Sequence, residues 1–441
     1  MLFNCASFAN MNVGIGWQVL QVRALAPVVR DMSAIKRLLI RGSFANLLLV
    51  ACLGVLLRAM PFVSSFPLSY KNMLHGHSHL AFGGWMMPVL LLLILFAFPK
   101  LAEKIHVRHW RNISLLLLMS AFGMMITFPL MGYNAVSIFF STLSILAGFY
   151  MAYVIRKATP KKKSYASLLF LRAGLFYLVL SAIGPFATGP LIAMGKSGSD
   201  LYYNAIYFYL HFQYNGWFTF AVLAVLYKMM EKRGGGKNGI VAFWLLHIVC
   251  VPAFLLSVLW TQPPVALNVL GGLAALLQLL AVYFVLKDLA ALPWKNRLAD
   301  TIILLSAGAF VLKTCLQFAS AFPSVAALAA EYRNFVIAYL HLVLLGFVSL
   351  FAFGALLRFC RVPVTSSLKT GFRFFLFAFF ITELLLVLQA LGSWLNFPIP
   401  HFSMLLFLFS CLLPVGIVMI GRRITNALTA DLKQGNQTIG F

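Results

Sequence analysis

Twelve apolar stretches, separated by short polar loops, divide almost the whole chain. A helix needs roughly 20 predominantly apolar residues to cross the hydrocarbon core of a bilayer. The composition agrees, because 62% of the 441 residues are hydrophobic and only 10% are charged. The sequence therefore predicts an all-α polytopic integral membrane protein. Its twelve transmembrane helices are expected over residues 37–60, 74–99, 112–132, 135–155, 165–192, 202–228, 239–260, 264–287, 299–322, 334–358, 371–393 and 401–421.

The loops between these stretches alternate in charge. Lysines and arginines are concentrated in every second loop, as in the KKK run at 161–163, and the intervening loops carry few. Cytoplasmic loops of membrane proteins are enriched in Lys and Arg. The alternation therefore places both termini in the cytoplasm of a multi-pass protein, expected in the bacterial inner membrane. The net charge of +25 follows from loops that face anionic lipid, so the expected partner is a lipid bilayer and not nucleic acid.

Three regions follow from this pattern. We expect an N-terminal cytoplasmic tail over residues 1–36, a membrane domain over residues 37–421 and a C-terminal cytoplasmic tail over residues 422–441. Met32 opens a basic segment that leads directly into the first apolar stretch. Residues 1–31 lack a clear apolar region followed by a signal-peptide cleavage site. Met32 is thus expected to be the true start, or residues 1–31 to be a poorly ordered tail.

Three of the nine histidines lie within five residues, in the segment LHGHSHLAFGGW at 74–85. Ionisable groups inside a membrane are costly and usually mark a ligand, ion or proton site. Imidazole is also a common ligand of haem iron and of copper. His75 and His79 share one face of a helix, whereas His77 points about 200° away from them. The three histidines are candidate cofactor ligands, but they cannot all bind one planar haem.

Other histidines lie at a similar depth in the same half of the membrane. His211 follows Tyr202 by nine residues and His341 follows Arg333 by eight, on stretches that begin at the outer face. At ~1.5 Å per residue, both lie roughly 12–14 Å below that face. His247 approaches from the cytoplasmic end of the seventh stretch. A single such histidine could be a core residue bonded to a carbonyl, but several at one depth favour a shared cofactor.

This arrangement resembles subunit I of the haem-copper oxidase superfamily. The resemblance covers about residues 37–421, through topology and histidine placement and not through continuous identity. It implies a low-spin haem held between histidines of spans two and ten. One of the three clustered histidines would then pair with His341, in YLHLVLLGF at 339–347. Histidine-x-histidine spans also give a looser resemblance to the NnrS family of bacterial membrane proteins.

The chain departs from the family's pattern at the second metal centre. The family binds a high-spin haem through the first histidine of the span-ten motif, where this chain has Tyr339. The family's copper ion takes one histidine from span six and two from span seven. His211 matches the first of these ligands, and His247 is the only histidine in span seven. Copper or a second haem near His211 and His247 is therefore implied, with an incomplete set of ligands for oxygen reduction.

Three further residues are candidates for the surroundings of such a centre. Lys313 lies in the outer half of span nine and Arg333 begins span ten, so either could meet a haem propionate. The alternatives are a snorkelling lysine and an ordinary interfacial arginine. Tyr214 flanks His211 and could tune it by hydrogen bonding, or simply pack in a chain that is 15% aromatic.

The leading hypothesis is a haem-binding membrane protein with a b-type haem and with copper or a second haem. It would transfer electrons, or bind or reduce a small gas such as nitric oxide or oxygen, together with an electron donor or partner subunit. Whether it is an oxidoreductase stays open. The alternative is a membrane transporter, or a haem- or metal-handling protein, that uses the same histidines. The small number of acidic residues, nine in all, argues against cation transport.

Overall fold

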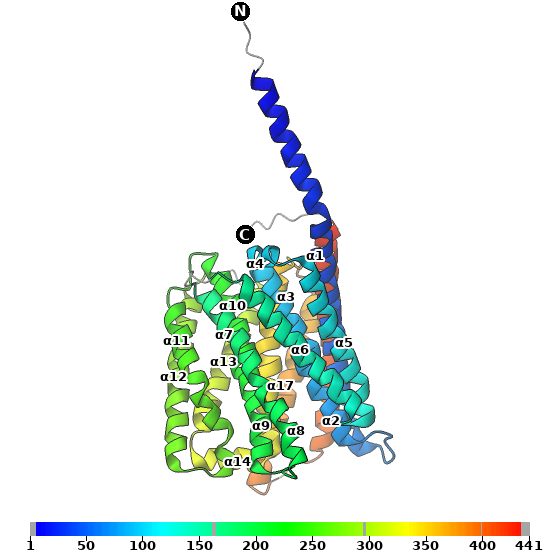
Figure 1. Ribbon diagram of the computed structural model, residues 1–441. Coiled ribbons are helices and arrows are strands. Elements are labelled where there is room, and N and C mark those ends of the chain that lie inside the picture. Colours follow the sequence, from blue (N-terminus) through cyan, green and yellow to red (C-terminus); the bar gives the residue numbers. More distant parts are fainter. Residues whose placement is uncertain (1–5, 161–164, 294–296, 398, 434–441) are drawn as a thin grey trace, which may run out of the picture.

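The computed structural model describes residues 6–160, 165–293, 297–397 and 399–433, with side chains from residue 31 to residue 430. Every regular element in these ranges is a helix, and the helices form an upright bundle (Figure 1). Most helices run along the bundle: α1 (Ala6–Ala59), α2 (Tyr70–His79), α3 (Met87–Ala97), α5 (Val107–Met131), α6 (Ala135–Ala158), α7 (Ala166–Ser181), α8 (Ile183–Ala193), α9 (Asp200–His211), α10 (Thr219–Glu231), α11 (Gly239–Cys250), α12 (Val265–Ala290), α13 (Leu298–Ala319), α15 (Arg333–His341), α16 (Leu350–Phe359), α17 (Ser366–Trp394), α18 (Phe402–Ser410) and α19 (Leu412–Lys433). Short helices lie at the bundle ends: η1 (Met60–Phe62), α4 (Pro99–Lys104) and α14 (Pro323–Glu331).

Ten helices in the described ranges are long and apolar enough to cross a membrane. They confirm ten of the twelve predicted spans. The sixth, predicted at 202–228, lies within continuous helix over residues 200–231, but its first half contains five tyrosines and is more polar. The seventh, predicted at 239–260, is α-helical only to Cys250. Pro252 lacks the N–H that an α-helix requires, and the chain continues in the 3₁₀ turns η4 (Pro252–Ser257) and η5 (Leu259–Thr261).

The two ends of the bundle can be told apart by their loops. The blue helix α1 enters and the red helix α19 leaves at the same end, where α4 also lies (Figure 1). The start of α2, the turn between α8 and α9, and α14 lie at the opposite end, which we call the distal end. The basic loop with α4 and the poorly charged α8–α9 turn thus lie at different ends, as the charge alternation predicted.

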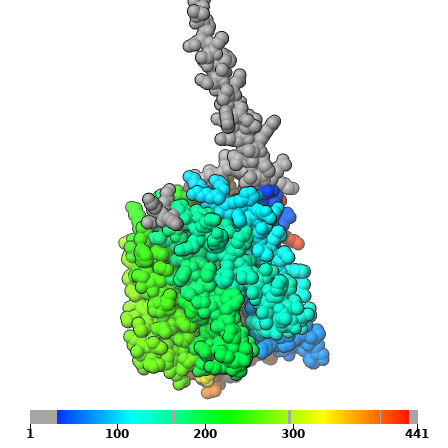
Figure 2. Space-filling model, in the orientation of Figure 1, coloured from blue at the N-terminus to red at the C-terminus, as the bar shows by residue number. Residues whose placement is uncertain are grey.

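Three helices form the centre of the bundle. The residues of α3 from Val89 to Leu93 have no exposed surface, and α10 and α16 are almost as completely buried. Both α10 and α16 pack against α3. Side chains fill the spaces between the outer helices on the face that Figure 2 shows, so the interior is screened from that side.

Each central helix is the second half of a longer one that carries a histidine. A π-helical segment joins the two halves: η2 (Leu80–Met86), η3 (Phe212–Phe218) and η6 (Leu342–Ser349). Each segment contains a glycine five residues after the histidine, namely Gly84, Gly216 and Gly346. A Cβ on Gly216 would lie 2.5 Å from Cβ of Tyr177 in α7, so only glycine allows this close approach of the helices.

Candidate functional site

Three histidines occupy equivalent places in the three central helices. His79, His211 and His341 are the last residues of α2, α9 and α15, and a π-helical segment begins directly after each. Single π-helical turns within α-helices are rare and often occur at functional sites. The same local sequence, His followed by four residues, glycine and Trp or Phe, occurs at all three places. These three histidines therefore mark a candidate site in the distal half of the bundle.

His77 points from α2 toward α1. Its Nδ1 atom lies 2.9 Å from the carbonyl oxygen of Val50. A carbonyl only accepts hydrogen bonds, so Nδ1 carries the proton and Nε2 is left with its lone pair. A Cβ on Gly54 would lie 3.2 Å from Cε1 of His77, so the glycine in α1 makes room for the imidazole. The ring orientation is thus fixed by α1.

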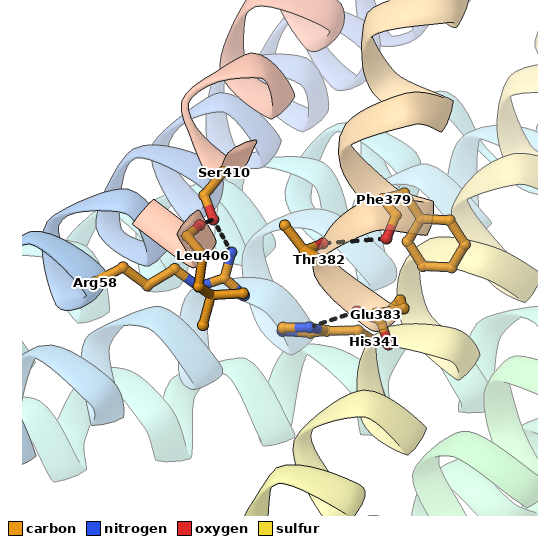
Figure 3. Close-up of polar contacts among 7 residues, drawn as sticks. All are labelled: Arg58, His341, Phe379, Thr382, Glu383, Leu406 and Ser410. Carbon is orange, nitrogen blue, oxygen red and sulfur yellow. Dashed lines mark hydrogen bonds and ion pairs between the residues drawn. The ribbon is translucent and has the colours of Figure 1, made fainter. Parts of the chain in front are cut away.

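His341 is held in the same way by a carboxylate. Its Nδ1 atom lies 3.1 Å from Oε1 of Glu383 in α17 (Figure 3). The side chains of His341 and Glu383 keep 21% and 15% of their surface exposed. The carboxylate accepts the Nδ1 proton, which again directs the free lone pair to Nε2. Within the described side chains, Nε2 of neither His77 nor His341 takes part in a hydrogen bond.

Arg58 adds a positive charge beside this pair. It lies close enough to Glu383 and to His77 to interact with both electrostatically. Its guanidinium donates a hydrogen bond to the hydroxyl of Ser410 in α18, which is hydrogen-bonded in turn to the carbonyl of Leu406 (Figure 3). The arginine therefore compensates the charge of Glu383 inside the bundle.

The donor set of His77 and His341 fits haem iron. The two residues lie close enough to interact electrostatically. Each has a hydrogen bond that fixes its ring and its tautomer, and each leaves Nε2 free, as ring nitrogens that bind a metal usually require. We therefore place the candidate haem site between α2 and α15, with Glu383 and Arg58 beside it.

His75 and His79 lie on another face of α2, as their spacing predicted. Nε2 of His79 lies 2.8 Å from the hydroxyl of Tyr133, and the ring of His75 meets the edge of the same tyrosine at 4.7 Å between centroids. Phe128 stacks on His79 at 4.1 Å. Neither histidine is turned toward α1, so His77 is the member of the cluster that fits the haem best.

His211 is fully buried, with both ring nitrogens hydrogen-bonded. Nε2 donates to the carbonyl of Cys250 at 2.8 Å, and Nδ1 accepts from the amide of Asn215 at 3.1 Å. The amide oxygen of Asn215 accepts in turn from Lys313 at 2.5 Å, and Lys313 also donates to Gln317 at 2.9 Å. The ammonium group of Lys313 thus binds two amide oxygens, and its pairing with a haem propionate stays a prediction.

His247 belongs to a different contact. Its Nδ1 atom lies 2.8 Å from the hydroxyl of Tyr177, and its ring stacks on Phe243. Within residues 31–430, apart from the gaps in the described ranges, no group of three or more His, Cys, Asp or Glu side chains could hold a metal ion. A copper ion at His211 would have to displace the carbonyl of Cys250 or the amide of Asn215. The residues around His211 and His247 therefore do not fit a copper centre.

Three other predicted residues lie in the helices that carry His211 and His341: Tyr214 in η3, and Arg333 and Tyr339 in α15. Tyr339 packs edge-on against Tyr214 with 6.0 Å between ring centroids, and its hydroxyl is buried without a hydrogen-bond partner among the described residues. Arg333 begins α15 and interacts electrostatically with Tyr207. Tyr339 thus makes an aromatic contact with the segment that carries His211.

One comparison with known proteins bears on this arrangement. A cryo-EM structure of a heme-copper terminal oxidase dimer matches 90% of this chain and 84% of its own, with a TM-score of 0.65 and 15% sequence identity. The chain has the fold of a haem-copper terminal oxidase. The predicted subunit I-like bundle is thereby confirmed. No protein-family model matches the sequence, and no curated protein does.

Two residues of the candidate site escaped the sequence analysis. Neither Glu383 nor Arg58 was among the predicted site residues. Both lie on helices that are distant in sequence from His341. A signal was present, because Glu383 is an isolated acid in the middle of a long apolar stretch, where an unpaired charge is costly.

Proposed function

We propose that this protein binds one b-type haem between His77 and His341 and transfers electrons within the bilayer. One observation carries the proposal: each imidazole is anchored through Nδ1 by a residue of a neighbouring helix and leaves Nε2 free. Haem iron with two imidazole ligands supplies one-electron redox chemistry.

The protein's own residues would set the properties of this site. The carbonyl of Val50 and the carboxylate of Glu383 hold protons at Nδ1 of the two histidines. A carboxylate on the ring N–H makes an imidazole a stronger donor and stabilises the oxidised metal. Arg58 lies beside Glu383 and offsets its charge, and the same guanidinium is suited to a propionate.

Electron transfer fits this chain better than reduction of a gas. A haem with two protein ligands leaves no open position for a small molecule. His211, which the family resemblance matches to a copper ligand, has both ring nitrogens hydrogen-bonded, to the carbonyl of Cys250 and to the amide of Asn215. We propose that an electron donor or a partner subunit exchanges electrons with the haem, and that the distal end faces the outside of a bacterial inner membrane.

The test is a reduced-minus-oxidised visible spectrum of the detergent-purified protein. The wild-type protein should give the sharp signal of a low-spin b-type haem, and His77→Ala and His341→Ala should each abolish it. His75→Ala is the matched control, because it lies on the same helix and faces Tyr133, and it should keep the signal. A colourless wild-type protein expressed with haem supplied, or an unchanged spectrum in His341→Ala, would refute the proposal.

A further inference from the structure

The proposed haem site uses one of the three clustered histidines and leaves His75 and His79 without a role. They lie one helical turn apart on α2, near the distal end of the bundle. At ~1.5 Å per residue, His75 is roughly 8 Å from the start of the helix. Both side chains meet Tyr133, in the turn that connects α5 and α6.

The two imidazoles differ in whether the Nε2 atom has a hydrogen-bond partner. Nε2 of His79 has the hydroxyl of Tyr133 at 2.8 Å. Nε2 of His75 is buried and has no hydrogen-bond partner among the side chains described. A buried polar atom without a partner destabilises the folded protein, so such atoms usually meet a water molecule or a ligand.

The chemistry of the cluster suits a transition-metal ion. Two histidines four residues apart on a helix present both imidazoles to one point. Imidazole nitrogen is a preferred ligand of Cu²⁺ and Zn²⁺, and affinity for a given site is highest for Cu²⁺. Phe128 stacks on His79 and fixes its ring, which reduces the entropy lost on binding.

Tyr133 can complete the site as a neutral ligand. Its hydroxyl already lies 2.8 Å from Nε2 of His79, and the tyrosine is 57% exposed. It can offer its oxygen to a metal ion or give way to water. Lys71 lies near His75 and its positive charge works against a bound cation, so a moderate affinity is expected.

We propose that His75, His79 and Tyr133 form a binding site for a divalent transition-metal ion, Cu²⁺ or Zn²⁺, at the distal end of the bundle. The site is separate from the one assigned to haem, because His77 points to α1 and the other two histidines point to the α5–α6 turn. The same short segment of α2 thus serves two centres on two faces.

The test is a titration of the purified, chelator-treated full-length protein with Cu²⁺, followed by electron paramagnetic resonance. We expect one saturable site with hyperfine structure from two nitrogens, and competition by Zn²⁺. His75→Ala and His79→Ala should each weaken binding at least tenfold, and Tyr133→Phe should weaken it less. Thermal unfolding of each variant shows whether it is folded.

Two controls separate this proposal from the haem proposal. His77→Ala should keep the copper signal and lose the haem spectrum, whereas His75→Ala should do the reverse. His109→Ala removes a histidine at the other end of the bundle and should change neither. Copper binding that is equal in wild type and in folded His75→Ala and His79→Ala, or that is absent from the wild type, would overturn the proposal.

Discussion

Nδ1 of His341 and Oε1 of Glu383 lie 3.1 Å apart and connect α15 to α17 in the distal half of the bundle. An acid in the middle of an apolar helix is costly unless it is paired. Here the acid is paired with a histidine whose other nitrogen is free, and Arg58 lies beside it. The pair thus places a negative charge beside the imidazole that we propose as a haem ligand.

Glu383→Gln should raise the midpoint potential of the haem. The neutral amide still accepts from Nδ1 of His341, so the ligand stays in place, but the negative charge that stabilises the oxidised metal is lost. We expect an increase of about 60 mV, which corresponds to a tenfold change in relative affinity for a one-electron couple. A spectroelectrochemical titration measures it.

Glu331→Gln serves as the matched control for this measurement. Glu331 is the last residue of α14, at the distal end of the bundle. Its change to glutamine removes the same negative charge, and Glu331 does not contact His341. Its variant should keep the wild-type potential. If Glu383→Gln had the wild-type potential as well, the carboxylate would have no electronic role.

Gly216→Ala should destabilise the bundle by about 1–3 kcal/mol, the usual cost of overpacking a core. The added Cβ would lie 2.5 Å from Cβ of Tyr177, in the π-helical segment that follows His211. Gly308→Ala is the control, since an added Cβ there meets nothing within 4 Å. It should be neutral or slightly stabilising, because alanine favours a helix. Thermal unfolding in detergent distinguishes the two variants, and equal midpoints would contradict the packing argument.

Asp288→Ala should destabilise the end of the bundle opposite the haem by about 3 kcal/mol. Asp288 is 4% exposed, and its carboxylate accepts hydrogen bonds from the backbone N–H and the side chain of Asn238, at 3.0 and 2.7 Å. It also accepts from Tyr227 at 3.3 Å. Alanine leaves these donors unpaired. Glu103→Ala, at an exposed position, should leave the unfolding temperature unchanged.

The architecture could be predicted from the sequence because it depends on local properties. The length of each apolar stretch and the charge of each loop follow directly from the sequence. Ten of the twelve predicted spans are helices long and apolar enough to cross a membrane. The predicted seventh span could not be delimited in this way. Apolar composition continues to Trp260, but Pro252 ends the α-helix at Cys250, so hydropathy and helical geometry disagree there.

The candidate site could be predicted only in part, because it depends on which helices are neighbours. Helical periodicity separated His77 from His75 and His79, and the structure confirms that they face different elements. Periodicity cannot tell which face meets another helix. The pairing of His341 with Glu383 and the contacts of His211 follow from tertiary packing. Copper was predicted at His211, whose two ring nitrogens are both hydrogen-bonded, and at His247, whose Nδ1 is hydrogen-bonded to Tyr177.

His211→Ala should leave the copper content of the protein unchanged and lower its stability. Both nitrogens of His211 are hydrogen-bonded, and its removal leaves the carbonyl of Cys250 and the amide of Asn215 unpaired in the interior. Each unpaired group costs about 1–3 kcal/mol. Elemental analysis beside thermal unfolding checks both parts of this expectation. A variant that lost bound copper and kept the wild-type unfolding temperature would show instead that His211 is a metal ligand, and that its hydrogen bonds to Cys250 and Asn215 give way to copper in the working protein.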